Sequence, residues 1–312
     1  MDFGLHLPGS SPGVKPADLI RFVQQAEALG FYCVTVADHV IVPHSISIPY
    51  PYTIDGKYPG SGYHLETLTT MSFLAGTTER IRFITSVMIA PYRNPIITAK
   101  MLASLDVLSE GRVIAGLGVG WMKEEFEKLN APRFSERGRV TDEYIKAFRE
   151  LWTKDNPSFA GDYCHFSDII FLPKPVQKPT IPIWIGGHSK AALRRAGELG
   201  DGWHPIGGVP TIPLEPEDVK RDREILAGYA QKAGRNPRDI RVALKGSLFD
   251  REKQITPGKR RRFLGSAEEI ASDIRDYRAA GVDTMIFDVR RPTPSETLER
   301  MEWMAKEVIA EI

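Results

Sequence analysis

Short apolar runs alternate with longer amphipathic stretches along the whole chain. The short runs are rich in Val, Ile and aromatic residues, which favours buried strands. The longer stretches carry apolar residues three and four positions apart, which is the period of a helix that packs on one face. In chain order, the short runs predict eight strands, at 3–7, 31–37, 81–87, 112–117, 181–185, 202–206, 239–249 and 283–289.

At least one predicted helix follows each of these strands. The helices are expected at 15–29, 65–76, 95–108, 123–129, 136–152, 190–199, 217–233, 266–281 and 296–309. Strand–helix units whose strands are apolar throughout favour an α/β fold, the closed (β/α)8 TIM barrel. An open, doubly wound sheet is the alternative, because periodicity alone does not prove closure. We expect a single domain over 1–312 with insertions near 40–63 and 155–180, the second a β-hairpin.

The balance of charges narrows the classes of partner. Lys and Arg total 41 and Asp and Glu total 40, a formal net charge of +1, so no overall field favours nucleic acid or an anionic membrane. Two cysteines, Cys33 and Cys164, indicate buried thiols in a reducing compartment and no disulfide framework. The N-terminus has no basic segment leading into an apolar one, and no apolar run approaches about 18 residues. We therefore expect a cytoplasmic protein that acts on a small molecule.

Residues at the carboxyl ends of the strands are the candidates for binding and catalysis, because ligands of parallel barrels bind there. In this chain the candidates are Asp38, His39, Ser86, Val87, Gly116, Gly118, Gly186, Gly187, His188 and Ser189. Consecutive strands are neighbours in a barrel, so the ends of the second to fifth strands can surround one extended ligand. The small residues among them leave room for a flat ring, and we interpret the set as a cofactor site.

The turn Gly186-Gly187-His188-Ser189 lies between an apolar strand and an Ala/Leu/Arg-rich helix. Glycine has no Cβ, so a ligand can approach its backbone N–H closely, and Ser189 is a suitable cap for the helix. Unpaired N–H groups and the positive end of the helix dipole together suit a phosphate. A tight strand-to-helix turn with a Ser cap and no ligand is the alternative interpretation.

His39 is the candidate for proton transfer, because an imidazole exchanges a proton near neutral pH. The neighbouring Asp38 is expected to fix its tautomer, and a merely structural hydrogen bond is the alternative. We expect no metal site, because His39 and His44 are the one sequence-near pair and lack convergent carboxylates. The chain has no Gly-x-Ser-x-Gly elbow, which disfavours a serine hydrolase.

Several segments, taken in order and spacing, resemble one known family. They include Phe3-Gly4-Leu5-His6-Leu7-Pro8, Asp38-His39, Thr85-Ser86-Val87, Gly116-Leu117-Gly118-Val119-Gly120-Trp121 with Glu125-Phe126, Pro182-Ile183-Trp184-Ile185-Gly186-Gly187-His188-Ser189, Asp201-Gly202-Trp203 and Gly265-Ser266-Ala267-Glu268-Glu269-Ile270. Over most of its length the chain resembles the bacterial-luciferase-like flavin oxidoreductases. Within them it looks like the branch that uses the deazaflavin coenzyme F420.

The resemblance implies a TIM barrel with the flavin ring across its mouth, near the second to fourth strands, and the phosphate after the fifth. It also implies a non-proline cis peptide between Ser86 and Val87, which backs the ring in this family. In sugar-phosphate dehydrogenases of the family, a His that matches His39 takes the substrate proton. Trp121 stands where those enzymes have a Glu, which puts a sugar-phosphate substrate in doubt. A homodimer is expected from the family.

We therefore expect an F420-dependent oxidoreductase that transfers a hydride between the deazaflavin C5 and a small organic substrate, with His39 as proton donor or acceptor. The same barrel with FMN, as a two-component monooxygenase, is the nearest alternative. A flavin-binding protein without turnover and a barrel hydrolase are the others. The run Lys259-Arg260-Arg261-Arg262 is a candidate partner for the acidic tail of F420, and a solvated loop is the alternative.

The loop 40–63 is dense in Pro, Gly and Tyr and is expected to cover the substrate side of the site. Its tyrosines are candidates for an aromatic wall: Tyr50, Tyr52, Tyr58 and Tyr63. Packing of these side chains on the scaffold alone is the alternative. The composition of the loop does not identify the substrate.

Overall fold

The computed structural model describes every residue except 11, 210 and 249–259. The apolar runs form the barrel strands: β1 Asp2–His6, β2 Cys33–Val36, β3 Arg82–Thr85, β5 Val113–Gly118, β8 Ile183–Gly186, β9 Gly202–His204, β10 Arg241–Ser247 and β11 Thr284–Asp288. The amphipathic stretches form the helices: α1 Pro16–Ala28, α2 Thr67–Ala75, α3 Pro95–Leu108, α4 Lys123–Lys128, α5 Arg137–Thr153, α6 Lys190–Leu199, α7 Pro216–Lys232, α8 Ala267–Ala279 and α9 Pro294–Trp303. The last helix continues as a π-helical turn, Met304–Val308. Phe249, the last residue of one predicted strand, lies outside the described residues.

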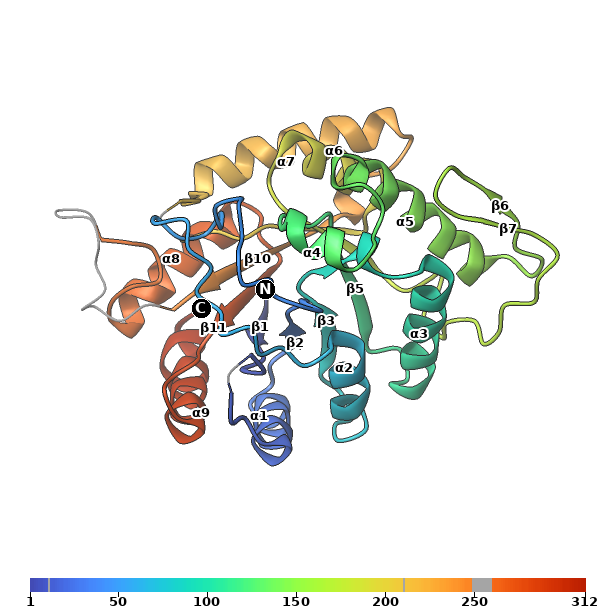
Figure 1. Cartoon of the computed structure of the whole chain (residues 1–312). Helices are drawn as coiled ribbons and strands as arrows, with labels where there is room; N and C mark the ends of the chain where they lie inside the picture. Colours follow the sequence, from blue (N-terminus) through green and yellow to red (C-terminus); the bar gives the residue numbers. More distant parts are fainter. Residues whose placement is uncertain (11, 210, 249–259) are drawn as a thin grey trace.

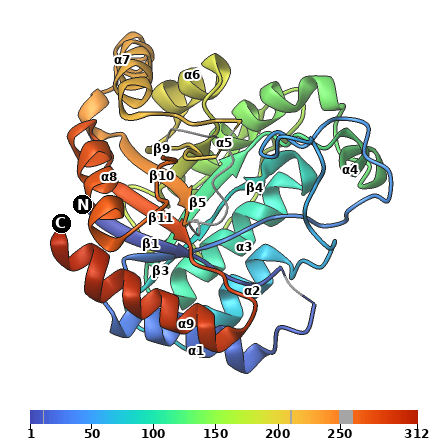
Figure 2. The same ribbon diagram turned by 90° about the vertical axis from the view of Figure 1, so that its left-hand side faces the viewer.

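The strands close into a barrel. Pairing runs in the order β3, β2, β1, β11, β10, β9, β8 and β5, and β3 also pairs with β5 in parallel. The described residues therefore form the predicted barrel of eight parallel strands, and the open doubly wound sheet is wrong. Helices lie outside the strands, with α1 beside α9 where the two ends of the chain meet (Figures 1 and 2).

Apolar side chains from six strands fill the inside of the barrel. They are Cys33, Ile84, Ile114, Trp184, Ala243 and Ile286, all buried. Glycines make room for their neighbours: a Cβ on Gly202 would lie 2.4 Å from the Trp184 ring, and one on Gly116 would lie 1.9 Å from the Thr85 carbonyl oxygen. The barrel is therefore a packed core, which leaves its rim as the place for a ligand.

Three further strands, each of two residues, lie outside the regular strand–helix units. β4, Met88–Ile89, follows β3 and pairs with the end of β5, and the 3-10 turn Ala90–Tyr92 leads from it towards α3. Two residues are too few to show a period, so the sequence does not predict this strand. The insertion at 155–180 does contain the predicted hairpin, in which β6 Phe159–Ala160 pairs antiparallel with β7 His165–Phe166.

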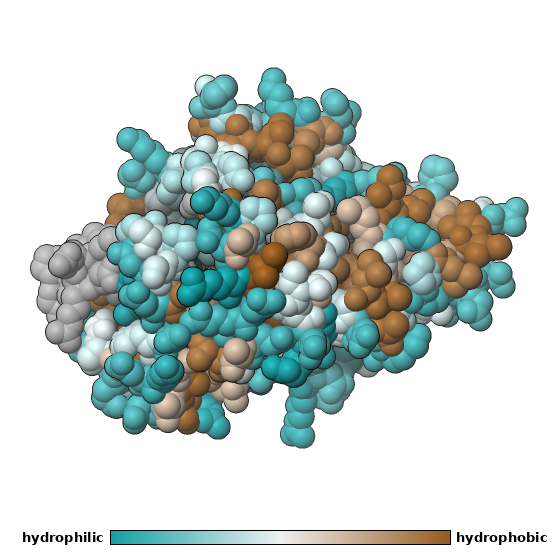
Figure 3. Space-filling model, turned by 90° about the horizontal axis from the view of Figure 1, so that it is seen from below, coloured by the Kyte–Doolittle hydropathy of each residue, from teal (hydrophilic) through white to brown (hydrophobic). Residues whose placement is uncertain are grey.

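Apolar side chains gather at one end of the surface, over α3 and the insertion that carries β6 and β7 (Figure 3). The exposed large apolar side chains on α3 and in this insertion are Ile97, Met101, Val107, Leu108, Ile170, Leu172 and Val176. A patch of this kind commonly marks a protein contact. The homodimer expected from the resemblance stays a prediction. None of the described helices combines the length and the apolar character needed to cross a bilayer.

Gly116→Ala is expected to destabilise the barrel, because its Cβ would lie 1.9 Å from the Thr85 carbonyl oxygen. Overpacking of this kind costs about 1–3 kcal/mol or more, measured as the free energy of unfolding in urea. Gly228→Ala, on α7, is the matched control, because nothing lies within 4 Å of its Cβ position. The control is expected to keep or raise stability, by up to about 1 kcal/mol. Equal stability of the two variants would contradict the packing argument.

Candidate functional site

A cleft of about 640 Å³ opens at the carboxyl ends of the strands, a volume typical of small-molecule sites. Of the residues that the sequence nominates, those that line it are Asp38, His39, Ser86, Val87, Gly186 and Gly187. Those outside its described lining are Gly116, Gly118, His188 and Ser189. The ends of β2, β3 and β8 therefore face one cleft.

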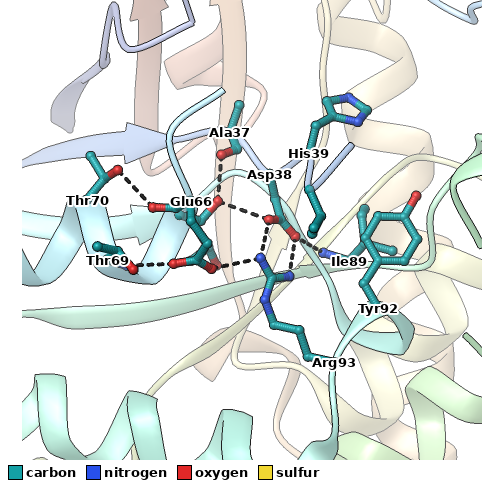
Figure 4. A network of polar contacts seen from close by, with 12 residues as sticks. Ala37, Asp38, His39, Glu66, Thr69, Thr70, Ile89, Tyr92 and Arg93 are labelled. Atoms are coloured by element: carbon teal, nitrogen blue, oxygen red, sulfur yellow. Dashed lines mark hydrogen bonds and ion pairs between the residues drawn. The ribbon is translucent and has the colours of Figure 1, made fainter. Parts of the chain in front are cut away.

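Asp38 is the centre of a buried network that fixes the frame of the cleft (Figure 4). Its carboxylate accepts two hydrogen bonds from Arg93, at 2.8 and 2.7 Å, one from the Ile89 amide at 2.8 Å and one from Thr67 Oγ1 at 3.0 Å. Arg93 also pairs with Glu66, the N-cap of α2, at 2.9 Å. The protein itself therefore fills the acceptor sites of Asp38, and the end of β2 is tied to β4, to α2 and to the segment before α3.

The prediction that Asp38 fixes the tautomer of His39 is wrong. His39 Nδ1 lies 2.9 Å from Glu125 Oε2, on α4. The Glu125 carboxylate also accepts hydrogen bonds from two backbone amides of the loop that follows His39. It accepts a further one from the Tyr92 hydroxyl at 2.9 Å. An ionised carboxylate only accepts, so Nδ1 of His39 carries the proton and Nε2 is the ring nitrogen left for a ligand.

Glu125 is the residue of this candidate site that the sequence does not single out. Its side chain is 0% exposed. Burial would raise its pKa, but the hydrogen bond and charge of His39, with the two loop amides, outweigh burial and lower that pKa. The carboxylate is therefore ionised at neutral pH. The one signal in the sequence is that Glu125 belongs to a segment that carries the family resemblance.

Three tyrosines of the loop 40–63 form an aromatic wall with Trp121. They are Tyr50, Tyr52 and Tyr58, all lining the cleft, with ring centroids of Tyr50 and its three neighbours 5.2–5.4 Å apart. The prediction is wrong for Tyr63, which is 37% exposed and outside the described lining. Earlier in the loop, the Ser47 amide donates a hydrogen bond of 2.8 Å to Glu124 on α4, which anchors the loop. Trp121 therefore shapes the cleft and carries no acid–base group.

A second hydrogen-bonded pair lies beside His39. Tyr58 OH and His64 Nε2 are 2.8 Å apart, and the ring centroids of His64 and His39 are 5.0 Å apart. Burial, and then the charge of His39, lowers the pKa of His64, and burial raises the pKa of Tyr58 to about 12. Both groups are therefore neutral at pH 7. In the described part of the chain, no group of three or more His, Cys, Asp or Glu side chains is arranged to hold a metal ion.

Four side chains, His6, Ser86, His204 and Lys245, form a polar floor of the cleft. Ser86 Oγ lies 3.0 Å from His204 Nε2, and His204 Nδ1 lies 2.6 Å from the Ala243 carbonyl oxygen. A carbonyl only accepts, so His204 Nδ1 donates to it and Nε2 accepts the Ser86 hydroxyl. Burial lowers the pKa of His204 to about 4, so its ring is neutral. Lys245 Nζ lies 3.4 Å from Ser86 Oγ and 3.2 Å from His6 Nδ1.

The turn between β8 and α6 has features that suit a phosphate. Gly187 has a φ of 100°, a conformation that favours glycine. Ser189 Oγ accepts a hydrogen bond from the Ala192 amide at 3.2 Å and caps α6 as predicted. Other N–H groups at the start of the helix have no acceptor within the helix. Trp203 Nε1 donates to the Gly187 carbonyl oxygen at 2.7 Å and holds the turn against β9. The side chain of His188 is exposed.

The peptide bond between Ser86 and Val87 is cis, as the resemblance implies. Two glycines make room for Val87: a Cβ on Gly118 would lie 2.5 Å from a Val87 methyl carbon, and one on Gly186 would lie 2.8 Å from the other. Gly118 therefore accommodates a side chain of the protein itself, as Gly116 accommodates the Thr85 carbonyl.

The described residues of the predicted cationic run have two environments: two of the arginines form ion pairs within the fold, and one lines the cleft. Arg260 and Arg262 both pair with the buried carboxylate of Asp273, at 2.6 and 2.8 Å. Arg261 lines the cleft and donates to a backbone carbonyl at 3.0 Å. Lys259 lies outside the described residues. The solvated-loop interpretation is therefore wrong for Arg260 and Arg262, and contact between this run and a cofactor tail stays a prediction.

Known proteins share this sequence pattern. A family model described as luciferase-like monooxygenase matches residues 1–254. The chain is 30% identical over 309 residues to an F420-dependent glucose-6-phosphate dehydrogenase of Amycolatopsis mediterranei, an alignment that covers 87% of this chain and 88% of that protein. It is 34% identical over 181 residues to an FMNH(2)-dependent dimethylsulfone monooxygenase of Pseudomonas putida, covering 57% of this chain and 49% of that protein.

A solved structure shares the architecture. An F420-dependent secondary alcohol dehydrogenase in complex with an F420-acetone adduct matches with a TM-score of 0.78, over 100% of this chain and 99% of that chain, at 20% sequence identity. At this identity the likeness shows the fold alone. The named relatives use either F420 or FMN, so the comparisons support a deazaflavin or flavin without choosing between them.

The Asp38–Arg93 pair is expected to stabilise the fold strongly, because its side chains are 0% and 15% exposed. Asp38→Asn removes the carboxylate charge from a buried guanidinium, a change that costs about 3–5 kcal/mol in the free energy of unfolding. Glu79→Gln is the control, because Glu79 and Arg80 are 86% and 71% exposed. Loss of such a surface pair changes stability by less than about 1 kcal/mol. An equally small change in Asp38→Asn would contradict its role in the frame.

Proposed function

The chain belongs to the luciferase-like monooxygenase family, and from that premise we propose that it is an F420-dependent oxidoreductase. In this proposal a hydride passes between the deazaflavin C5 and a small organic substrate, with His39 as proton donor or acceptor. The observation that carries the proposal is the pairing of His39 with the buried, ionised Glu125 at 2.9 Å in the cleft. Such a pair supplies the proton transfer that accompanies hydride exchange with a hydroxyl or carbonyl group.

His39 moves the proton at Nε2. Glu125 accepts a hydrogen bond from Nδ1, so it holds the imidazole in one tautomer and lies beside the charge that forms when Nε2 takes a proton. The Tyr92 hydroxyl and two loop amides occupy the remaining acceptor sites of Glu125 and hold its carboxylate in place. His39 therefore takes a proton from a substrate hydroxyl in oxidation and returns one to a carbonyl oxygen in reduction.

The residues of the cleft fit a flavin-type cofactor. The turn that contains Gly187 and the start of α6 would hold the phosphate, because unpaired N–H groups and the helix dipole favour an anion there. The segment with Ser86 and Val87 would back the ring, and the aromatic wall would face the substrate. A bound deazaflavin supplies or accepts the hydride at C5. The loop 40–63 would exclude water from the reacting atoms.

Two observations favour F420 as the cofactor. The relative named for F420 aligns over 87% of this chain, whereas the relative named for FMN aligns over 57%. The His39–Glu125 pair suits a reaction in which a substrate oxygen gains or loses a proton. An FMN-dependent monooxygenase on the same barrel is the second candidate, and the 34% identity to the dimethylsulfone monooxygenase favours it.

Titration of the apo-protein with F420 and with FMN, at the same ionic strength and read by fluorescence, tests the cofactor. We expect F420 to bind about tenfold or more tightly than FMN. Gly187→Ala is expected to weaken F420 binding by about tenfold or more, because a Cβ at a φ of 100° strains the turn and crowds its N–H groups.

Gly234→Ala is the matched control for that turn. Its φ is 71° and nothing lies within 4 Å of its Cβ position, so it carries a similar backbone penalty of about 1–2 kcal/mol, just after α7 and away from the cleft. The control should keep wild-type affinity. Tight binding of FMN with none of F420 would transfer the proposal to the monooxygenase, and unaltered affinity in Gly187→Ala would remove the turn from the site.

His39→Ala is expected to lower the kcat of F420 reduction by small alcohols by about 10²–10⁴-fold, because the proton acceptor is lost. The pH-dependent limb of turnover should disappear while F420 binding is kept. Glu125→Gln should give a smaller loss of kcat, because the imidazole remains but its orientation and charge partner do not.

His165→Ala, at an exposed residue of β7, is the control for removal of an imidazole and should keep wild-type turnover. Stopped-flow absorbance of F420 measures all three variants. An unaltered rate and pH profile in His39→Ala would end its assignment as the proton donor or acceptor.

A further inference from the structure

Lys245 is a lysine of the cleft whose close contacts in the described part of the chain are to uncharged groups. It lies on β10, is partly buried, and lines the cleft. Its Nζ contacts Ser86 Oγ at 3.4 Å and His6 Nδ1 at 3.2 Å, both on uncharged groups. On the adjacent strand β11, Asp288 is held by Arg290, with contacts at 2.9 Å. Among the residues that the structure describes, no carboxylate forms an ion pair with Lys245.

Among the charges that act on Lys245, that of Asp288 raises its pKa and that of Arg290, which holds Asp288, lowers it. Burial lowers the pKa of His6 and of His204, so both rings are neutral at pH 7. Burial also lowers the pKa of Lys245, to about 8, so the ammonium form persists at neutral pH against a desolvation cost. A desolvated ammonium without an ion-pair partner destabilises a fold. This point of the cleft therefore suits a ligand group that carries negative charge.

The polar floor is the part of the cleft that suits the polar edge of a flavin ring. Ser86 belongs to the segment that would back the ring, and its hydroxyl lies 3.4 Å from Lys245 Nζ. The aromatic wall of the loop 40–63 carries no charge. A pyrimidine edge presents carbonyl oxygens, which accept hydrogen bonds, so it fits a floor that contains an ammonium donor.

We propose that Lys245 donates a hydrogen bond to the N1–C2=O edge of the bound cofactor and stabilises the reduced ring over the oxidised one. The inference rests on the proposed function and holds for F420 and FMN alike. A hydride leaves a substrate C–H bond with both electrons and adds to the ring, at C5 of a deazaflavin or N5 of a flavin. The negative charge that the ring gains spreads over N1 and the C2 oxygen. Lys245 keeps its protons throughout and acts on this charge as a fixed cation.

Lys245→Met tests the proposal, because it removes the charge and keeps an unbranched side chain. We expect the equilibrium constant for reduction of the bound cofactor to fall about tenfold, which lowers the potential by about 30 mV for a two-electron couple. Spectroscopic titration against a reference dye measures the potential, with whichever of F420 and FMN the wild-type protein binds. Lys146→Met, on the exposed face of α5, makes the same change in net charge away from the cleft and should leave the potential unchanged.

Two more readouts separate this role from a structural one. The ratio of the dissociation constants of oxidised and reduced cofactor should change by the same factor as the equilibrium constant, because the four states form one thermodynamic cycle. Without cofactor, Lys245→Met should unfold at an equal or higher urea concentration than the wild type, because it loses an unpaired ammonium. Lys245→Arg, which keeps the charge, should hold the potential near the wild-type value.

The outcomes distinguish this inference from the proposed function. An unchanged potential in Lys245→Met, with the cofactor still bound, overturns the role of Lys245 and leaves the oxidoreductase standing. A marked loss of stability without cofactor assigns the lysine a structural role and also overturns it. If the wild-type protein binds neither F420 nor FMN, both proposals fall.

Discussion

The buried ion pair between Asp38 and Arg93 fixes the frame on which the rest of the cleft depends. It joins the end of β2 to the segment that precedes α3 and, through Glu66, to the start of α2. The protein itself fills the acceptor sites of Asp38, and its neighbour His39 pairs with Glu125 instead. Two adjacent residues therefore have separate roles: one holds the strand ends together and the other presents a ring nitrogen to a ligand.

The spacing of apolar residues predicts the barrel, because most of its strands coincide with a short apolar run and most of its helices have one apolar face. It does not predict β4, which has two residues. The position of His39 follows from its place after a strand, but its partner does not. Glu125 lies 86 residues further on, in a helix of six residues whose Lys and Glu side chains look solvent-exposed from the sequence. Contacts between such distant segments depend on packing, which no local pattern records.

Small residues at strand ends serve two different structural purposes, and the sequence alone does not distinguish them. Gly116 and Gly118 make room for Thr85 and Val87, which belong to the protein itself, whereas Gly187 is favoured by its backbone angle in the turn at the cleft. From the sequence alone all three are candidates for ligand contact, because the lack of a Cβ permits either use. The difference matters because we expect substitutions of the first kind to act on stability and those of the second kind to act on binding.

Two consecutive acids on α4 anchor the first part of the loop 40–63. Glu125 accepts hydrogen bonds from the two backbone amides directly after His39, and Glu124 accepts one from the amide of Ser47. The tyrosines of the wall all come after this anchor. Because the partner of His39 lies on α4 and outside the loop, substitutions at Tyr50 or Tyr52 can change the wall without altering the contact that holds the imidazole. On the proposed function, this layout lets the substrate side of the cleft diverge in evolution while the His39–Glu125 pair is inherited.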